Sequence, residues 1–171
     1  MSHRRGGHTP VGVVKVELKR ADAAELVATR PELSGAPLIK ALGPAAAAVL
    51  ATAVIRRFPD KMVLMQQGEA GDSLFFVIAG DVRLFARRDR DSAELGVAHG
   101  GEVLGEGEVL AGEGGRRCSA VAQGQVEVME LARPALLVDG KLPPGLVKVL
   151  EAVKQGRMKA LDEMSDFLNR W

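Results

Sequence analysis

The chain has 171 residues, of which 47% are hydrophobic, so it is long enough for one domain with a substantial apolar core. Its 23 lysines and arginines nearly balance 22 aspartates and glutamates, and a net charge of +1 excludes a general electrostatic field for nucleic acid or anionic lipid. The single cysteine, Cys118, excludes an intramolecular disulfide framework and a thiolate zinc cage, which favours a reducing cytoplasm.

Residues 1–36 are predicted to form an amino-terminal arm. Residues 1–10 are polar and rich in glycine, which favours disorder, and the apolar run after them is too short for a signal peptide. Residues 11–20 combine a short apolar run with alternation, so an isolated strand and a helical arm both fit. Residues 21–33 are rich in helix formers, and the Ser-Gly-Ala-Pro break after them predicts a boundary near residue 36.

Two helices are predicted between this boundary and the first strand. Residues 37–42 favour a short helix, and Gly43-Pro44 favours the start of a second one that ends near Arg57. The longest apolar stretch, residues 41–55, is shorter than the roughly 20 residues that a membrane span needs. It is therefore interpreted as a buried helix, and no membrane partner is expected.

Beyond Phe58 the pattern changes to short apolar segments separated by turn formers, which is typical of closely spaced β-strands. The segments are residues 61–67, 73–80, 81–88, 93–100, 102–106, 118–124 and 126–132. Because no helical patterns lie between them to form parallel βαβ units, they predict a β-roll or jelly roll.

The carboxy-terminal part is predicted to be helical, first after Pro134 and then in a long helix over residues 145–171. Its apolar stripe consists of Leu150, Val153, Leu161, Met164, Leu168 and Trp171, and Gly156-Arg157 interrupts it. The stripe must be buried against the β-roll or a partner helix, so a homodimer through this helix is one expectation.

The glycine-rich stretch 101–120 is the strongest candidate site. It lacks the Lys-Ser/Thr pair of a Walker loop, and Leu110 stands where a dinucleotide fingerprint needs its third glycine. A third hypothesis is a loop between strands in which backbone N–H groups and an arginine hold an anion while a glutamate accepts a sugar hydroxyl. The glycines, the glutamate and the arginine that this hypothesis needs occur here in that order.

Three segments carry a family resemblance: Phe58 to Phe85, His99 to Leu110, and Arg116 to Ala122. Together they resemble the cyclic-nucleotide-binding domain of the bacterial catabolite activator and of the kinase A regulatory subunit, over about residues 37–150. The resemblance implies a mainly β fold with flanking α-helices: an eight-stranded β-roll, with a long carboxy-terminal helix from residue 151. It implies a cytoplasmic regulatory module that binds cyclic AMP or cyclic GMP, with cyclic AMP favoured, and signals through protein contacts. An enzyme is not expected, because the sequence shows no nucleophile–base pair and no metal cluster.

By motif, the resemblance assigns ligand contacts to the cassette. Gly105 lets the backbone pass close to the ligand, Glu106 accepts the ribose 2′-hydroxyl, and Arg116 binds the cyclic phosphate, with Arg117 as the alternative. Three further glycines, Gly68, Gly71 and Gly80, are interpreted as structural markers at turns.

Two departures affect the ligand. Gly107 and Glu108 follow the Gly-Glu pair where the family has an apolar and then a small residue, and Arg117 replaces a small residue. An exposed Glu108–Arg117 pair is favoured, and Glu108 would oppose binding if it pointed inward. The alternative function is a degenerate β-roll that serves as an interaction or scaffold module.

Other chemistry finds little support. The three histidines, His3, His8 and His99, are dispersed, so no metal site is expected. Cys118 stands at a strand position expected to be buried and inert. Activator-type relatives have a helix-turn-helix after the long helix, whereas this sequence stops at Trp171, so no DNA-binding output is expected.

Overall fold

The computed structural model describes residues 14–16 and 20–169. Residues 1–10, for which disorder is predicted, lie outside the described residues. Val14–Val16 forms strand β1, so this part of the arm is a strand, but it pairs with β2 and is not isolated as predicted.

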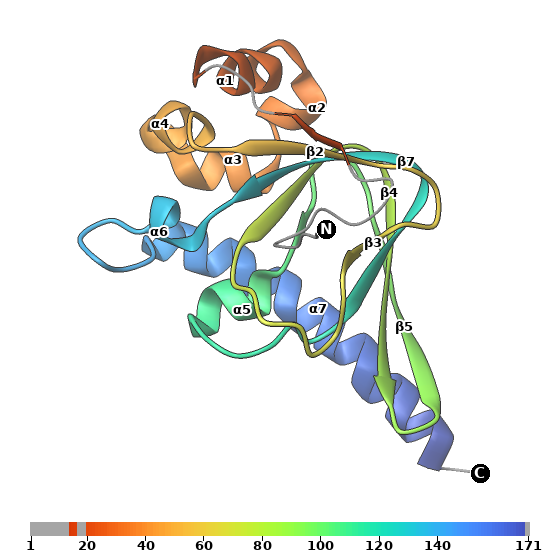
Figure 1. Cartoon of the computed structure of the whole chain (residues 1–171). Helices are drawn as coiled ribbons and strands as arrows, with labels where there is room; N and C mark the ends of the chain where they lie inside the picture. The colour runs from red at the N-terminus through yellow and green to blue at the C-terminus, as the bar shows by residue number, and fades with distance from the viewer. Residues whose placement is uncertain (1–13, 17–19, 170–171) are drawn as a thin grey trace, which may run out of the picture.

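The described residues form a seven-stranded antiparallel sheet that curves around a core (Figure 1). Its path is β1-β2-β7-β4-β5, with β3 paired to β7 and β6 paired to β4. The other strands are β2 (Val54–Phe58), β3 (Val63–Met65), β4 (Leu74–Arg88), β5 (Asp91–Ala98), β6 (Val103–Leu104) and β7 (Ser119–Leu131). The predicted mainly β architecture is confirmed.

Two pairs of predicted segments run together as long, bent strands. In β4 the bend falls at Gly80, which has φ of 91° and lies so close to the carbonyl of Gln125 that a Cβ would clash with it. The pairing register with β7 shifts on either side of Ala79. In β7, Gly124 with φ of 80° stands between the two segments. Glycine takes these conformations without the steric cost of a side chain, so the strands can curl into a roll.

Both faces of the sheet are buried near the start of β4. Phe76 contributes to a cluster shared with the helices, whereas Phe75 and Val77 contribute to a second cluster on the inner side of the roll. Successive side chains point to opposite faces of a strand, so a strand covered on both sides has a continuous apolar sequence. This explains the unbroken run of residues 74–78.

The helices cover the ends and one side of the sheet (Figure 1). They are α1 (Arg20–Thr29), α2 (Pro31–Ser34), α3 (Pro37–Leu42), the 3₁₀ turn η1 (Gly43–Ala45), α4 (Ala46–Leu50), α5 (Glu106–Ala111), α6 (Arg133–Leu136) and α7 (Pro144–Asn169). Val27 of α1 and Leu33 of α2 belong to the same apolar cluster as Leu38 of α3.

The prediction that one helix runs from Gly43 to near Arg57 is wrong. The helix ends at Leu50, and residues 54–58 form strand β2 between β1 and β7. Arg56 and Arg57 pair across the sheet with Glu130 at 2.7 Å and Glu127 at 2.6 Å. Sheet pairing, supported by Val54 and Ile55, therefore overrides the helical tendency of the preceding alanines.

Helix α7 begins at Pro144, close to the predicted start, and passes beside α5 and β5 (Figure 1). Leu146 and Leu150 are fully buried in the cluster shared by the helices, and Leu161 packs against the inner cluster of the roll. The side chains of Met164, Leu168 and Trp171 lie outside the described residues. No helix in the described part of the chain is long and apolar enough to cross a membrane.

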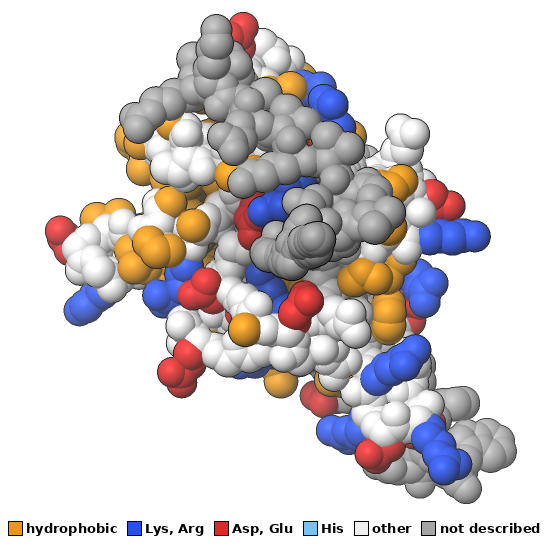
Figure 2. Space-filling model, in the orientation of Figure 1, with side chains coloured by type: hydrophobic (Ala, Val, Ile, Leu, Met, Phe, Trp, Pro, Cys, Tyr) orange, Lys and Arg blue, Asp and Glu red, His pale blue; other side chains and the backbone are white. Residues whose placement is uncertain are grey.

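Acidic and basic side chains are interspersed on the face shown in Figure 2, rather than gathered by sign. This agrees with the near-balanced charge of the sequence. Among the described residues, this face therefore shows no large patch of basic side chains that would attract a polyanion.

Gly156→Ala is expected to stabilise the protein by about 0.5–1 kcal/mol, because glycine is a poor helix former and, apart from its chain neighbours and its own helix backbone, no atom lies within 4 Å of the position of an added Cβ. Urea unfolding measures the change. Gly80→Ala is the contrasting control and should be destabilising, because its Cβ meets the backbone of β7. A destabilised Gly156→Ala variant would contradict the open environment of this position.

Candidate functional site

The predicted cassette lies between β6 and β7 and consists of Gly105, the short helix α5 and the loop that leads to Ser119. Gly105 has φ of 84°, and a Cβ there would lie 2.7 Å from both Arg116 Nη1 and the carbonyl oxygen of Ser73. Its lack of a side chain is therefore required twice, by the backbone conformation and by the packing of Arg116.

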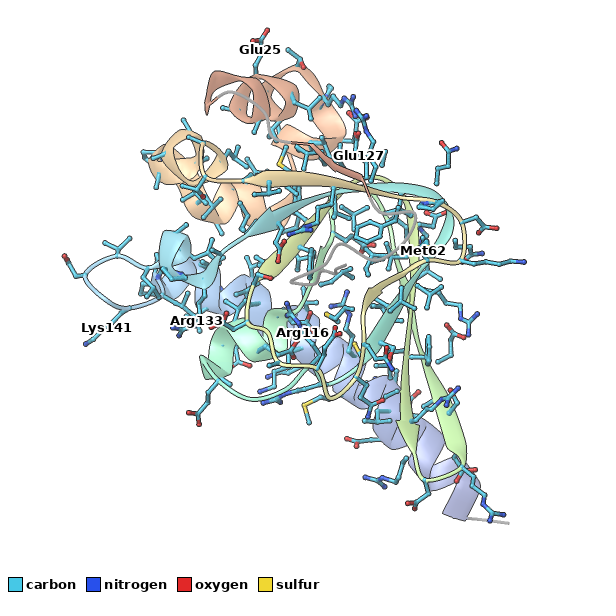
Figure 3. The ribbon with its side chains drawn as sticks, viewed as in Figure 1. Glu25, Met62, Arg116, Glu127, Arg133 and Lys141 are labelled. Carbon is cyan, nitrogen blue, oxygen red and sulfur yellow. The ribbon has the colours of Figure 1, made fainter. Side chains whose placement is uncertain are left out.

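Arg116 is the centre of the cassette, beside α5 (Figure 3). It is only 6% exposed, and its Nη1 donates to the carbonyl oxygen of Ser73 at 2.9 Å while Nη2 donates to the Ser73 hydroxyl at 3.0 Å. The guanidinium carbon lies 5.4 Å from the ring centre of Phe75. A Cβ on Gly71 would lie 2.9 Å from Arg116 Nε, so Gly71 makes room for the guanidinium.

Glu108 points inward and pairs with Arg116. Arg116 Nη1 donates to Glu108 Oε1 at 3.2 Å, and the two side chains are 5% and 4% exposed. The expected surface pair of Glu108 with Arg117 is therefore wrong, because Arg117 is exposed whereas Glu108 is buried. A buried charge needs a partner, and Arg116 provides it.

Glu106, at the start of α5, forms an ion pair with Arg157 of α7. Arg157 Nη2 also donates to the carbonyl oxygen of Val103 at 2.7 Å. Burial raises the pKa of the Glu106 carboxyl above its ordinary value, and the nearby Arg157 charge opposes that rise. The two carboxylates of α5 are thus each paired with a guanidinium, Glu108 with Arg116 of the cassette and Glu106 with Arg157 of α7.

A cavity of about 140 Å³ lies between the cassette, β5 and α7. Apolar side chains of Met65, Leu95, Cys118, Met158 and Leu161 contribute to its wall, together with Glu106, Gly107, Glu108, Arg117 and Arg157. A Cβ on Gly107 would lie 3.2 Å from Arg117 Cδ, so Gly107 lets the Arg117 side chain pass over the cassette. The wall therefore combines apolar surface with a few charged groups, as ligand pockets do.

A second cavity, of about 230 Å³, is lined by Arg116, Phe58, Phe75 and Ser73. Glu130 lies in its wall and accepts hydrogen bonds from the Ser73 hydroxyl at 2.6 Å and from Arg56 Nε at 2.7 Å. Met65 lines both cavities. The Arg116–Glu108 pair contributes one residue to each wall. Arg116 donates to Ser73, whose hydroxyl in turn donates to Glu130.

Cys118 is buried, as predicted, and burial raises the pKa of its thiol to about 12. The thiol should therefore stay protonated at neutral and mildly alkaline pH, where only the thiolate is a strong nucleophile. We expect native protein at pH 8 to resist alkylation by iodoacetamide at least tenfold more than urea-unfolded protein, as measured by mass spectrometry. Equal labelling rates would contradict the burial of this thiol.

The structure brings the six predicted site residues together in one cassette: Gly105, Glu106, Gly107, Glu108, Arg116 and Arg117. Sequence reasoning did not assign roles to Ser73 and Phe75, which hold Arg116, or to Arg157, which holds Glu106. The sequence signal for Arg157 was its place as a charged interruption of an apolar helix stripe. No group of three or more potential metal ligands occurs among the residues that the structure describes.

The fold is thus an antiparallel β-roll in which a glycine-initiated cassette holds a buried arginine and a buried glutamate. Residues 55–138 match the model of the cyclic nucleotide-binding domain family. Residues 55–138 therefore form a domain of this family, as the sequence motifs indicated.

Relatives and solved structures agree with this membership. The chain is 32% identical over 142 residues to the cyclic AMP receptor protein of Thermus thermophilus, a match that covers 80% of this chain and 64% of the relative. The crystal structure of the Thermus thermophilus catabolite activator protein matches with 29% identity and a TM-score of 0.56, covering 78% of this chain and 63% of that one.

A regulatory subunit of a cAMP-independent protein kinase A from Trypanosoma brucei, a triple mutant bound to cAMP, matches with a TM-score of 0.68 and 18% identity. This match covers 84% of this chain and 53% of that one and shows the fold alone. The chain thus spans less than two thirds of the length of these three proteins.

Proposed function

We propose that this chain is a regulatory module that binds a cyclic nucleotide, with cyclic AMP as the first candidate, and signals through protein contacts. The observation that supports the proposal most is the arrangement of Arg116, whose guanidinium is buried and oriented by Ser73 and Phe75 inside the cassette. An oriented, always-charged guanidinium is suited to a phosphodiester. The name of the Thermus thermophilus relative, a cyclic AMP receptor protein, favours cyclic AMP.

In the proposed complex, the ligand replaces groups of the protein. The cyclic phosphate takes the place of the Glu108 carboxylate on Arg116, and the ribose 2′-hydroxyl donates to Glu106. The cassette cavity of about 140 Å³ is smaller than the roughly 300 Å³ at the low end of small-molecule pockets, so binding requires Glu108 and the neighbouring part of α7 to move. A ligand can drive such a change only through its higher affinity for the opened arrangement.

Isothermal titration of the whole chain with cyclic AMP and cyclic GMP tests the proposal. We expect saturable binding of one nucleotide per chain, weakened at least tenfold in Arg116→Ala, because a charge-assisted bond to a partly desolvated phosphate contributes about 1.5–3 kcal/mol. Arg117→Ala is the matched control, since it removes an adjacent exposed guanidinium. If both variants lost affinity equally, the phosphate contact would be assigned to Arg117 or to the overall positive charge around the cassette. If neither nucleotide bound to the wild type, the proposal that the module is a sensor would be contradicted.

The Glu108–Arg116 pair favours a second candidate function, a β-roll that has lost its ligand and serves as an interaction module. In that case the carboxylate is a permanent internal replacement for phosphate. The melting temperature would then stay constant with millimolar nucleotide, and only a protein partner would raise it. In either function the module is regulatory and carries no catalytic role.

A further inference from the structure

Two positive side chains in the wall of the cassette cavity have no counter-charge. Arg117 and Lys154 both line this cavity of about 140 Å³. Its two carboxylates, Glu106 and Glu108, are each already paired with another guanidinium. Among the residues that the structure describes, neither Arg117 nor Lys154 forms an ion pair. These two positive charges are therefore available to a ligand in the cavity.

The place of Arg117 at the cavity depends on Gly107. A Cβ on Gly107 would lie 3.2 Å from Arg117 Cδ and 3.4 Å from Arg117 Nε, so an apolar side chain there would crowd the arginine. Gly107 and Arg117 both depart from the residues that the family has at these positions. The two departures fit one another, because the side chain that is missing at residue 107 makes room for the additional guanidinium.

Lys154 reaches the same cavity from α7. It shares the cavity-facing side of this helix with three later residues at helical spacing, Arg157, Met158 and Leu161. Lys154 is partly buried, in contrast to a freely solvated lysine. The cavity lies between α7 and the cassette, so its two unpaired positive charges come from two different walls.

We propose that the cassette binds a cyclic dinucleotide, whose second phosphate is held by Arg117 and Lys154. The inference rests on the proposed function, in which the first phosphate takes the place of Glu108 on Arg116. The charged groups that line the cavity, with Arg116 added, carry an excess of two positive charges. A cyclic mononucleotide would neutralise one of them, whereas the two phosphodiesters of a cyclic dinucleotide neutralise both. Arginine and lysine are both suited to bind phosphate.

The second cavity provides space for the larger ligand. It has a volume of about 230 Å³ and is lined by Arg116, whereas Glu108 lines the cassette cavity of about 140 Å³. The contact between Arg116 and Glu108 at 3.2 Å therefore separates the two cavities. When a phosphate displaces Glu108 from Arg116, the two volumes can join. Together they exceed the roughly 300 Å³ at the low end of small-molecule pockets.

Isothermal titration of the whole chain with cyclic di-AMP and with cyclic AMP tests the proposal. We expect cyclic di-AMP to bind at least tenfold more tightly than cyclic AMP. Arg117→Ala and Lys154→Ala should each lower the affinity for cyclic di-AMP at least tenfold more than they lower the affinity for cyclic AMP, because only the dinucleotide has a second phosphate. Lys159→Ala is the matched control, since it removes an exposed positive charge of α7 that does not line the cavity, and it should change either affinity less than threefold.

The proposal would be overturned if cyclic di-AMP bound no more tightly than cyclic AMP, or if its affinity did not depend on Arg117 and Lys154. An equal loss in Lys159→Ala would also overturn it, because the effect would then come from the overall charge of the helix. In these cases the binding of cyclic AMP would still support the proposed function. If cyclic di-AMP bound as expected and cyclic AMP did not bind, the second phosphate site would be supported and cyclic AMP would be wrong as the ligand. If neither nucleotide bound, both proposals would be contradicted.

Discussion

Arg116→Ala is expected to lower the free energy of unfolding by about 3–5 kcal/mol, because it leaves the buried Glu108 carboxylate without its counter-charge. The Ser73 hydroxyl and carbonyl oxygen lose their guanidinium donors at the same time. For a chain of this size, such a loss corresponds to a melting temperature lower by roughly 10 °C. Calorimetry and urea unfolding of the ligand-free protein measure both quantities.

The double variant Glu108→Ala/Arg116→Ala separates the pair from the rest of the site. If the unpaired carboxylate dominates the cost, the double variant should be more stable than Arg116→Ala alone, and the two substitutions should be strongly non-additive. Arg117→Ala, at an exposed position, should change the free energy of unfolding by no more than about 0.5 kcal/mol. A double variant that is less stable than Arg116→Ala would show that Glu108 stabilises the fold without Arg116.

The fold was predictable from the sequence because strong local signals agreed with the global architecture. Glycines at the bends of β4 and β7 mark turns, and residues 74–78 form a continuous apolar run of the kind that both-face burial requires. The error at residues 51–58 has a clear cause. Alanines favour a helix locally, whereas the partners of β2, such as Glu127 and Glu130, lie some 70 residues later in the chain and are invisible to local reasoning.

The position of the cassette could be predicted from its sequence motif, but the pairing of its charged side chains could not. A carboxylate in a glycine-rich loop is most often solvated, so the sequence favours an outward Glu108. The structure buries it because α5 turns this face toward Arg116, whose position is fixed by Ser73, the residue directly before β4. The contact between Arg157 and Glu106 joins residues 51 positions apart, and only the course of α7 along the roll brings them together.

Glu108→Ala is expected to raise the affinity for cyclic AMP at least tenfold, which corresponds to about 1.4 kcal/mol. In the wild type a phosphodiester has to displace a carboxylate from Arg116 and approach that like charge in a buried site. The substitution removes both costs and gives the cassette the small residue that the family has at this position. It leaves the donors of Arg116 to Ser73 in place, so the phosphate site keeps its orientation.

Isothermal titration of Glu108→Ala and Glu113→Ala with cyclic AMP measures this effect. Glu113 is the matched control because it is an exposed carboxylate in the same cassette, and its removal should change the affinity less than threefold. If both variants gained equally, the benefit would come from the general charge of the cassette, because long-range repulsion acts from exposed groups too. If Glu108→Ala bound more weakly than the wild type, the carboxylate would have to contact the ligand directly, and its pairing with Arg116 would belong only to the empty site.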